Sequence, residues 1–60
     1  MNAIDRAVAF NQLAQDFGLQ HNEIGAKIGR SREYVSNSIR LLALPEAIQQ
    51  SVINKEISEG

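Results

Sequence analysis

Cysteine is absent from this sequence of 60 residues, and histidine and proline occur once each. Without cysteine the chain can form neither a disulfide framework nor a thiolate metal site, and its one histidine, His21, cannot build a zinc cluster. No apolar run is longer than residues 41–44, whereas a membrane helix needs roughly 18 apolar residues. Asp5 and Arg6 interrupt the first segment, which therefore lacks a signal-peptide pattern. These absences predict a soluble, cytoplasmic chain with no membrane contact, cofactor, metal or small-molecule substrate.

Positive charge is concentrated in one part of the chain, although the formal net charge is only −1. Residues 27–40 contain four bases and one acid, Glu33, whereas the remaining residues contain six acids and two bases. A local concentration of this kind is the electrostatic footprint expected on a nucleic-acid-binding element. The acidic flanks should weaken non-specific attraction to phosphates. The other interpretation is that these are ordinary solvated charges. The four bases are Lys27, Arg30, Arg32 and Arg40.

Apolar residues at helical spacing predict a single all-α domain of about four helices that takes up the whole chain. The first helix is expected over residues 3–16, with Gly18 as its stop. Pro45 suits the first position of a fourth helix, because its missing N–H costs nothing there. Residues 57–60 have the composition of a connector with Ser58 as a cap, which suggests a fragment of a longer protein. The apolar face of the first helix is expected to contain Ile4, Ala7, Val8, Phe10, Leu13 and Phe17, and that of the fourth Ile48, Val52 and Ile53.

Residues 21–40 have the spacing of two short helices that meet at a tight turn. Ile24 and Ile28 lie one helical turn apart and would share the buried face of the first of them, expected over residues 22–28. Gly29 is expected to end this helix, because glycine enters the left-handed conformation without a side-chain penalty. The pattern is typical of a helix-turn-helix, a motif that reads DNA.

The two ends of this motif carry further signals. Gln20 and His21 make a poor N-terminal cap, because serine, threonine or aspartate would serve better there. Gly25 removes a side chain from the inner face, where the second helix of the motif would cross closely. Ser31 offers its hydroxyl as the N-cap of that second helix, which is expected over residues 32–42. The apolar face of the second helix contains Val35, Ile39 and Leu42.

The opposite face of the helix over residues 32–42 carries groups that hydrogen-bond the edges of bases. Arg40 can bridge O6 and N7 of guanine or contact a phosphate, and Asn37 can pair with N6 and N7 of adenine. Ser31 and Arg32 lie at the helix N-terminus, where free amides and the dipole attract a phosphate. The other interpretation is that a short polar face of this kind is common on exposed helices. The residues of this face are Glu33, Ser36, Asn37 and Arg40.

Three more residues are candidates for contact with the phosphate backbone. His21 begins the first helix of the motif, where it can reach a phosphate, and a solvated histidine in the cap region is the alternative. Lys27 projects outward late in that helix, and Arg30 lies in the turn. The predicted DNA-binding residues are therefore His21, Lys27, Arg30, Ser31, Arg32, Ser36, Asn37 and Arg40.

Two other functions compete with DNA binding. Tyr34 and Leu41 share a flank beside the apolar face, and they are expected to pack against the first or fourth helix rather than to stack on bases. A small helical module that docks a partner protein on this flank is the alternative function. An enzyme is not predicted, because one histidine, no cysteine and no paired carboxylates on a common face leave no acid/base or nucleophile constellation.

Four groups of residues carry a family resemblance. They are Phe17-Gly18-Leu19, Glu23-Ile24 with Lys27-Ile28-Gly29, residues 31–37, and residues 40–46. Together they resemble the central DNA-binding domain of ParB-type partition proteins, and among these the chromosomal ParB and nucleoid-occlusion group. The resemblance covers nearly the whole chain, and the run of motifs in register is more specific than a bare helix-turn-helix pattern.

The resemblance implies binding to a palindromic, centromere-like site in double-stranded DNA, as one half of a homodimer, in bacterial chromosome or plasmid partition. It implies a protein associated with the nucleoid, whose third helix enters the major groove. It further implies an N-terminal domain that binds CTP and a C-terminal dimerisation domain, neither of which lies within these 60 residues. The DNA-facing residues that it implies are Ser31, Arg32, Ser36, Asn37 and Arg40.

The chain departs from the family pattern in three places. Gln20-His21-Asn22 stands where the family has Thr-Gln-Glu, which alters a phosphate contact. Gly25 takes a place generally held by alanine, and this should cost about 1 kcal/mol of helix propensity. The family continues into a further helix beyond the end of this chain, so apolar surface on the fourth helix is expected to be exposed.

Overall fold

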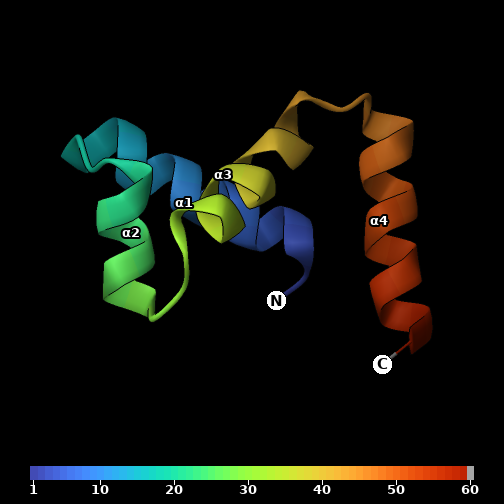
Figure 1. The fold of residues 1–60 in the computed structure, drawn as a ribbon. Coiled ribbons are helices and arrows are strands. Elements are labelled where there is room, and N and C mark those ends of the chain that lie inside the picture. The colour runs from blue at the N-terminus through green and yellow to red at the C-terminus, as the bar shows by residue number, and fades with distance from the viewer. Residues whose placement is uncertain (60) are drawn as a thin grey trace.

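Four α-helices and one short 3-10 helix make up the described part of the chain, which is the backbone of residues 1–59 and the side chains of residues 1–56 in this computed structural model. No strand occurs in that part of the chain, so the predicted all-α class is confirmed. The elements in order are α1 Ala3–Phe17, α2 His21–Ile28, α3 Arg32–Arg40, the 3-10 helix η1 Leu41–Ala43 and α4 Glu46–Glu59 (Figure 1).

Local signals define α1 at both ends. The side chain of Asn2 accepts a hydrogen bond from the backbone N–H of Asp5 at 2.8 Å, which caps the helix N-terminus. Gly18 ends the helix in the left-handed region with φ of 65°, as predicted. The prediction that Val8 and Phe17 belong to the buried apolar face of α1 is wrong, because both side chains are exposed. Val8 lies about 100° around the helix from the buried Ala7, and Phe17 is the last residue of α1.

The short helix α2 begins at His21, one residue before the predicted start. The cap is better than its composition indicated, because a Glu23 carboxylate oxygen accepts from the backbone N–H of Gln20 at 2.9 Å. Gly29 ends the helix with φ of 73°, as predicted. The expectation that Ile28 shares the buried face is wrong, because Ile28 is 41% exposed. The buried residues of α2 are therefore Ile24 and Gly25 in the middle of the helix.

Ser31 caps α3 as predicted, because its hydroxyl oxygen accepts from the backbone N–H of Tyr34 at 3.2 Å. The α-helix ends at Arg40 rather than at residue 42, and η1 continues the chain. Leu44, which precedes Pro45, is extended with φ of −76° and ψ of 151°. A residue before proline is disfavoured in the α region, and this restriction ends the helical run at Ala43.

Pro45 lies just before α4 rather than at its first position, which corrects the prediction by one residue. Its carbonyl accepts from the backbone N–H groups of Ile48 and Gln49 at 2.9 and 3.0 Å. Ile48 is exposed, as expected for apolar surface on this helix, whereas Val52 and Ile53 are half-buried. The connector predicted over residues 57–60 is wrong for residues 57–59, which continue α4. Gly60 and the side chain of Ser58 lie outside the described residues.

The hydrophobic core lies where α1, α2 and α3 meet, and it is centred on Phe10, Ile24 and Val35. The last two of these side chains are fully buried. In contrast, α4 stands beside this three-helix body and packs on α1 (Figure 1). Glu56 makes that contact, accepting from the backbone N–H of Ala3 at 2.9 Å and pairing with Arg6 at 3.3 Å. The helix-turn-helix therefore has a core that does not depend on α4.

Gly25 lies against the backbone of the turn. A Cβ added at Gly25 would stand 2.6 Å from the carbonyl oxygen of Arg30 and 3.1 Å from that of Ser31. The predicted close approach is therefore present, but turn carbonyls make it rather than the body of α3. The same glycine accepts a hydrogen bond at its own carbonyl from the Arg30 N–H at 2.8 Å, which holds the turn close.

Replacing Gly25 by valine is expected to lower the free energy of unfolding by about 1–3 kcal/mol, because the backbone of the turn must move. Chemical denaturation followed by circular dichroism measures this. Ala26→Val is the matched control, since Ala26 is the next residue of α2 and is exposed. Equal destabilisation by the two variants would show that β-branching in the helix, rather than the contact with the turn, causes the loss.

Candidate nucleic-acid interface

The helix α3 presents a polar strip on the side opposite to its buried residue. Val35 is fully buried, whereas Arg32, Glu33, Asn37 and Arg40 are exposed. The polar strip is defined here as Glu33, Asn37 and Arg40 together with Ser36, which is half-buried. A side chain locked in the core prevents the helix from rotating about its own axis, so the direction in which the strip faces is set by packing.

Asn37 and Arg40 act as a pair at the exposed centre of the polar strip. The Arg40 Nη1 group donates to the Asn37 Oδ1 atom at 3.4 Å, a long contact between two exposed side chains. Both side chains remain accessible, so this contact can be exchanged for contacts with a ligand. An amide and a guanidinium held side by side offer two planar hydrogen-bonding groups, the geometry that matches the edges of adenine and guanine.

The N-terminus of α3 adds positive charge. Arg32 is its first residue and is exposed, while the Ser31 hydroxyl oxygen is engaged with the Tyr34 N–H. Arg30 is exposed in the turn, and its guanidinium lies over the Tyr34 ring at 5.0 Å from the ring centre. A cation held over an aromatic face in this way is attracted by the negative charge of the ring face. Two guanidinium groups and the free amides of α3 therefore flank one end of the polar strip.

His21 and Ser36 come together although fifteen positions separate them. The His21 Nδ1 atom and the Ser36 Oγ atom lie 2.7 Å apart, and both residues are half-buried. The sequence predicted that both residues bind DNA, but it did not indicate their contact with each other. That contact depends on how α2 crosses α3. Lys27 stands apart from this pair in the last turn of α2, where it is exposed.

Tyr34 belongs to the core side of α3. Its ring meets that of Phe10 edge to face, with 6.1 Å between the ring centres and 66° between the planes. The prediction that Tyr34 packs against the first helix is therefore confirmed. Leu41, its predicted companion, is half-buried in η1.

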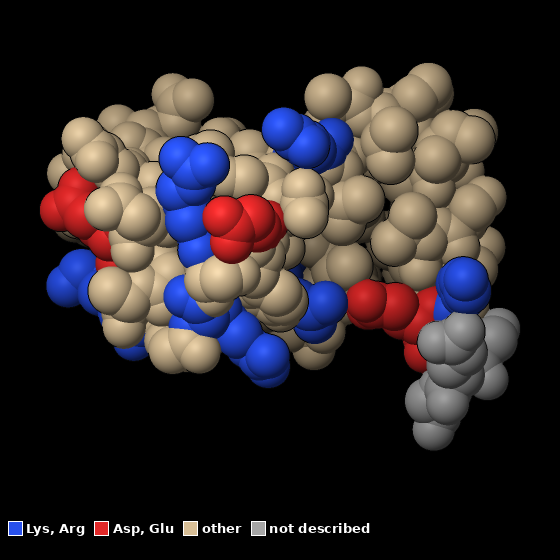
Figure 2. All heavy atoms as spheres, viewed as in Figure 1, with Lys and Arg blue, Asp and Glu red and all other residues tan. Residues whose placement is uncertain are grey.

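Basic side chains outnumber acidic ones on the face that contains the helix-turn-helix. Figure 2 shows Lys and Arg side chains spread over the part of the surface that holds α1 to α3, with fewer Asp and Glu side chains among them. Glu33 lies within the polar strip and reduces its positive charge. The surface is therefore moderately basic rather than strongly so, which limits attraction that does not depend on sequence.

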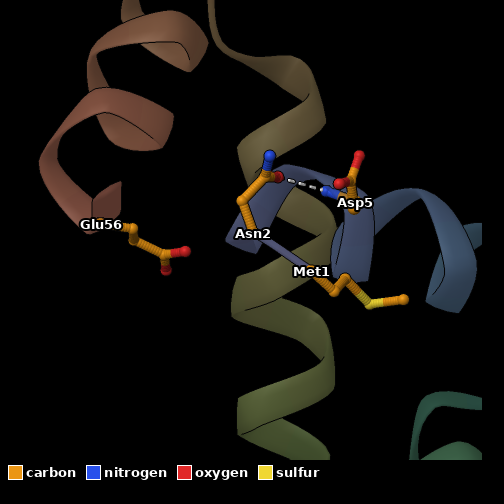
Figure 3. Close-up of a pocket in the computed structure, with 4 residues that line it drawn as sticks. All are labelled: Met1, Asn2, Asp5 and Glu56. Carbon is orange, nitrogen blue, oxygen red and sulfur yellow. Dashed lines mark hydrogen bonds between the residues drawn. The ribbon is translucent and has the colours of Figure 1, made fainter. Parts of the chain in front are cut away.

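A shallow depression of about 350 Å³ lies between the start of α1 and α4, lined by Met1, Asn2, Asp5 and Glu56 (Figure 3). The side chains of Asn2 and Glu56 are already used within the fold. Asn2 caps α1 through the Asp5 N–H, and Glu56 accepts from the backbone N–H of Ala3. Nothing in this depression indicates a ligand. Among the described side chains, those of residues 1–56, no grouping of acidic and histidine residues suits a metal ion. No helix in the described part of the chain has the length and apolarity to cross a membrane.

Comparison with known proteins agrees with the geometry. The family model of the ParB HTH domain matches residues 1–60. The chain belongs to the ParB HTH-domain family. Probable chromosome-partitioning proteins ParB of Neisseria meningitidis serogroup A and of Mycobacterium leprae are each 40% identical to it over 60 residues, which is all of this chain and 21% and 18% of those proteins. A nucleoid occlusion protein of Shouchella clausii is 32% identical over 59 residues, 98% of this chain and 21% of that protein.

This ParB HTH domain therefore spans about a fifth of the length of the curated relatives that it matches. No solved structure matches the chain. The family model agrees with the resemblance expected from the motifs at residues 31–37 and 40–46, which form α3 with its cap and the turn into α4.

Proposed function

We propose that this ParB HTH domain binds double-stranded DNA in a sequence-specific way, with α3 lying in the major groove. The observation that carries the proposal is the exposed polar strip on α3, held outward by the fully buried Val35 and Ile24. Membership of the ParB HTH-domain family supports the same conclusion, since relatives of this chain are named chromosome-partitioning proteins. An α-helix fits the width of the major groove, where each base pair presents a distinct pattern of donors and acceptors.

The residues divide into two roles in this proposal. Asn37 and Arg40 read base edges, because their planar groups lie together at the exposed centre of the strip. The other candidates, apart from Ser36 within the polar strip, bind the phosphate backbone and set the register of α3, and such contacts carry no sequence information by themselves. This second group comprises Lys27, Arg30, Ser31 and Arg32, and His21 joins it through its second ring nitrogen.

The biological setting follows from the same membership. We propose that the chain is the DNA-reading part of a partition protein that associates with the nucleoid and segregates a bacterial chromosome or plasmid. In the parent protein two copies would bind the two halves of a palindromic site as a homodimer, because two-fold protein symmetry is matched by two-fold symmetry of the DNA. The local charge around α3 supplies the phosphate attraction that such a role requires.

Docking of a partner protein on the Tyr34/Leu41 flank is the second candidate function. The contacts of Tyr34 within the fold argue against it. Phe10 packs on one side of its ring and Arg30 lies over it. Truncating Tyr34 would therefore damage the core before it tested any docking surface. The polar strip needs no such rearrangement to meet a ligand.

Selection of bound sequences from random duplex DNA tests the proposed function. We expect one short sequence to be enriched, and a palindrome with a regular half-site spacing if two copies bind together. Fluorescence anisotropy with the enriched duplex and a scrambled duplex then gives the specificity ratio at a stated salt concentration. Equal binding to the two duplexes at every salt concentration would contradict the proposal.

A further inference from the structure

The contact between His21 and Ser36 links the two helices of the motif through side chains that do not belong to the core. The 2.7 Å separation of His21 Nδ1 and Ser36 Oγ is a short hydrogen bond. It joins the first residue of α2 to Ser36 at the half-buried edge of the polar strip. Both residues are half-buried, so one side of each faces the partner while the other remains open to solvent.

Other serines in this chain show what the hydroxyl of Ser36 would do without the histidine. Ser38 and Ser51 each donate to the backbone carbonyl four residues earlier, at 2.8 and 3.1 Å. This local bond is the common choice for a serine inside a helix. Ser36 instead meets the imidazole of His21. A neutral imidazole has one acceptor nitrogen and one donor nitrogen, so an Nδ1 atom that accepts the Ser36 proton leaves Nε2–H as the donor.

We propose that His21 is a positioning residue that fixes the Ser36 hydroxyl as a hydrogen-bond acceptor within the DNA-facing strip. The inference rests on the proposed function and names one element of its specificity. With its proton directed at His21, Ser36 offers only oxygen lone pairs to a base. Such an acceptor favours the amino groups of adenine and cytosine over the acceptor atoms that guanine and thymine present in the major groove. The Nε2–H group of His21 is left to donate to a phosphate oxygen.

Base preference at a single position of the selected site tests this inference. Selection is repeated with His21→Phe, Ser36→Ala and the double variant. We expect each single variant to lose the preference for adenine or cytosine at one and the same position. Each should bind the best duplex about three- to tenfold more weakly, the range of one hydrogen bond. The double variant should be no weaker than His21→Phe, because His21→Phe already loses both the fixed orientation of the Ser36 hydroxyl and the contact of Nε2–H with a phosphate.

Conservative variants separate positioning from simple support of the fold. His21→Asn keeps an acceptor close to the place of Nδ1 and should retain the base preference, whereas His21→Gln places its amide near Nε2 and should lose it. Ser38→Ala is the matched control on the same helix, because the Ser38 hydroxyl bonds only within α3, and it should leave the preference unchanged. Thermal unfolding of every variant shows which of them are folded. If His21→Phe is not folded, the comparison of His21→Asn with His21→Gln tests the role of His21 instead.

The experiment distinguishes failure of the proposed function from failure of the role proposed for His21. If the unaltered chain selects no sequence, the proposed function itself is wrong. If it selects a site whose base preferences are the same in His21→Phe and Ser36→Ala, or if the two losses of affinity simply add, DNA binding stands and the role of His21 is overturned.

Discussion

Replacing Ile24 by alanine is expected to lower the free energy of unfolding by about 2–5 kcal/mol, the largest effect of any single change considered for this chain. Ile24 is fully buried and packs with Phe10 and Val35 at the centre of the core. Removing its side chain leaves a cavity between α1, α2 and α3. At roughly 0.05–0.15 kcal/mol per residue, a domain of 60 residues has about 3–9 kcal/mol of stability, so this loss would remove a large part of it. Denaturant titration by circular dichroism measures the loss.

Ile28→Ala is the matched control for this prediction. It changes the same residue type one turn further along α2, at a position that is 41% exposed. We expect a loss below about 1 kcal/mol. Similar losses for Ile24→Ala and Ile28→Ala would contradict the core described here. They would also remove the physical reason for the outward direction of the polar strip on α3.

Asn37→Ala and Arg40→Ala are each expected to lose about 1–3 kcal/mol of preference for the selected DNA site over a scrambled duplex. The reason is that a bidentate contact with a base edge discriminates against the wrong base. Both side chains are exposed, so neither change should unfold the chain. Anisotropy titrations with the two duplexes, combined with thermal unfolding, measure preference and stability separately.

Arg32→Ala provides the contrast, because Arg32 lies at the N-terminus of α3 and is proposed to contact a phosphate. It should weaken binding to both duplexes about equally and reduce the salt dependence of binding by about one phosphate contact. The division of roles is wrong if Arg32→Ala changes the preference for the site while Asn37→Ala and Arg40→Ala leave it intact.

Signals that act within a few residues predicted their structures well. Gly18 and Gly29 end α1 and α2 in the left-handed region, and the Ser31 hydroxyl caps α3, as their residue types indicate. Such features depend on local backbone geometry. The same locality explains the correct fold class and the family resemblance, since both depend on spacing along the chain.

Predictions that depended on neighbours from other elements were less reliable. Ile24 and Ile28 are equivalent in the helical pattern, yet one is fully buried and the other largely open. Phe17 was predicted to belong to the apolar face of α1 but lies exposed at the end of that helix. Helical periodicity gives the direction in which a side chain points around the helix axis. It does not show whether another helix lies beside that side chain to bury it.

The amino-acid sequence by itself determined the helix-turn-helix, the Ser31 cap of α3 and the Gly29 turn, because glycine, serine and apolar spacing act over one or two helical turns. The identity of the candidate DNA-facing residues followed from the same spacing. Only the tertiary structure decided which isoleucine enters the core, how closely Gly25 approaches the turn and that His21 meets Ser36. These outcomes depend on where α1, α2 and α3 cross, and that geometry arises from packing of the whole core rather than from any local preference.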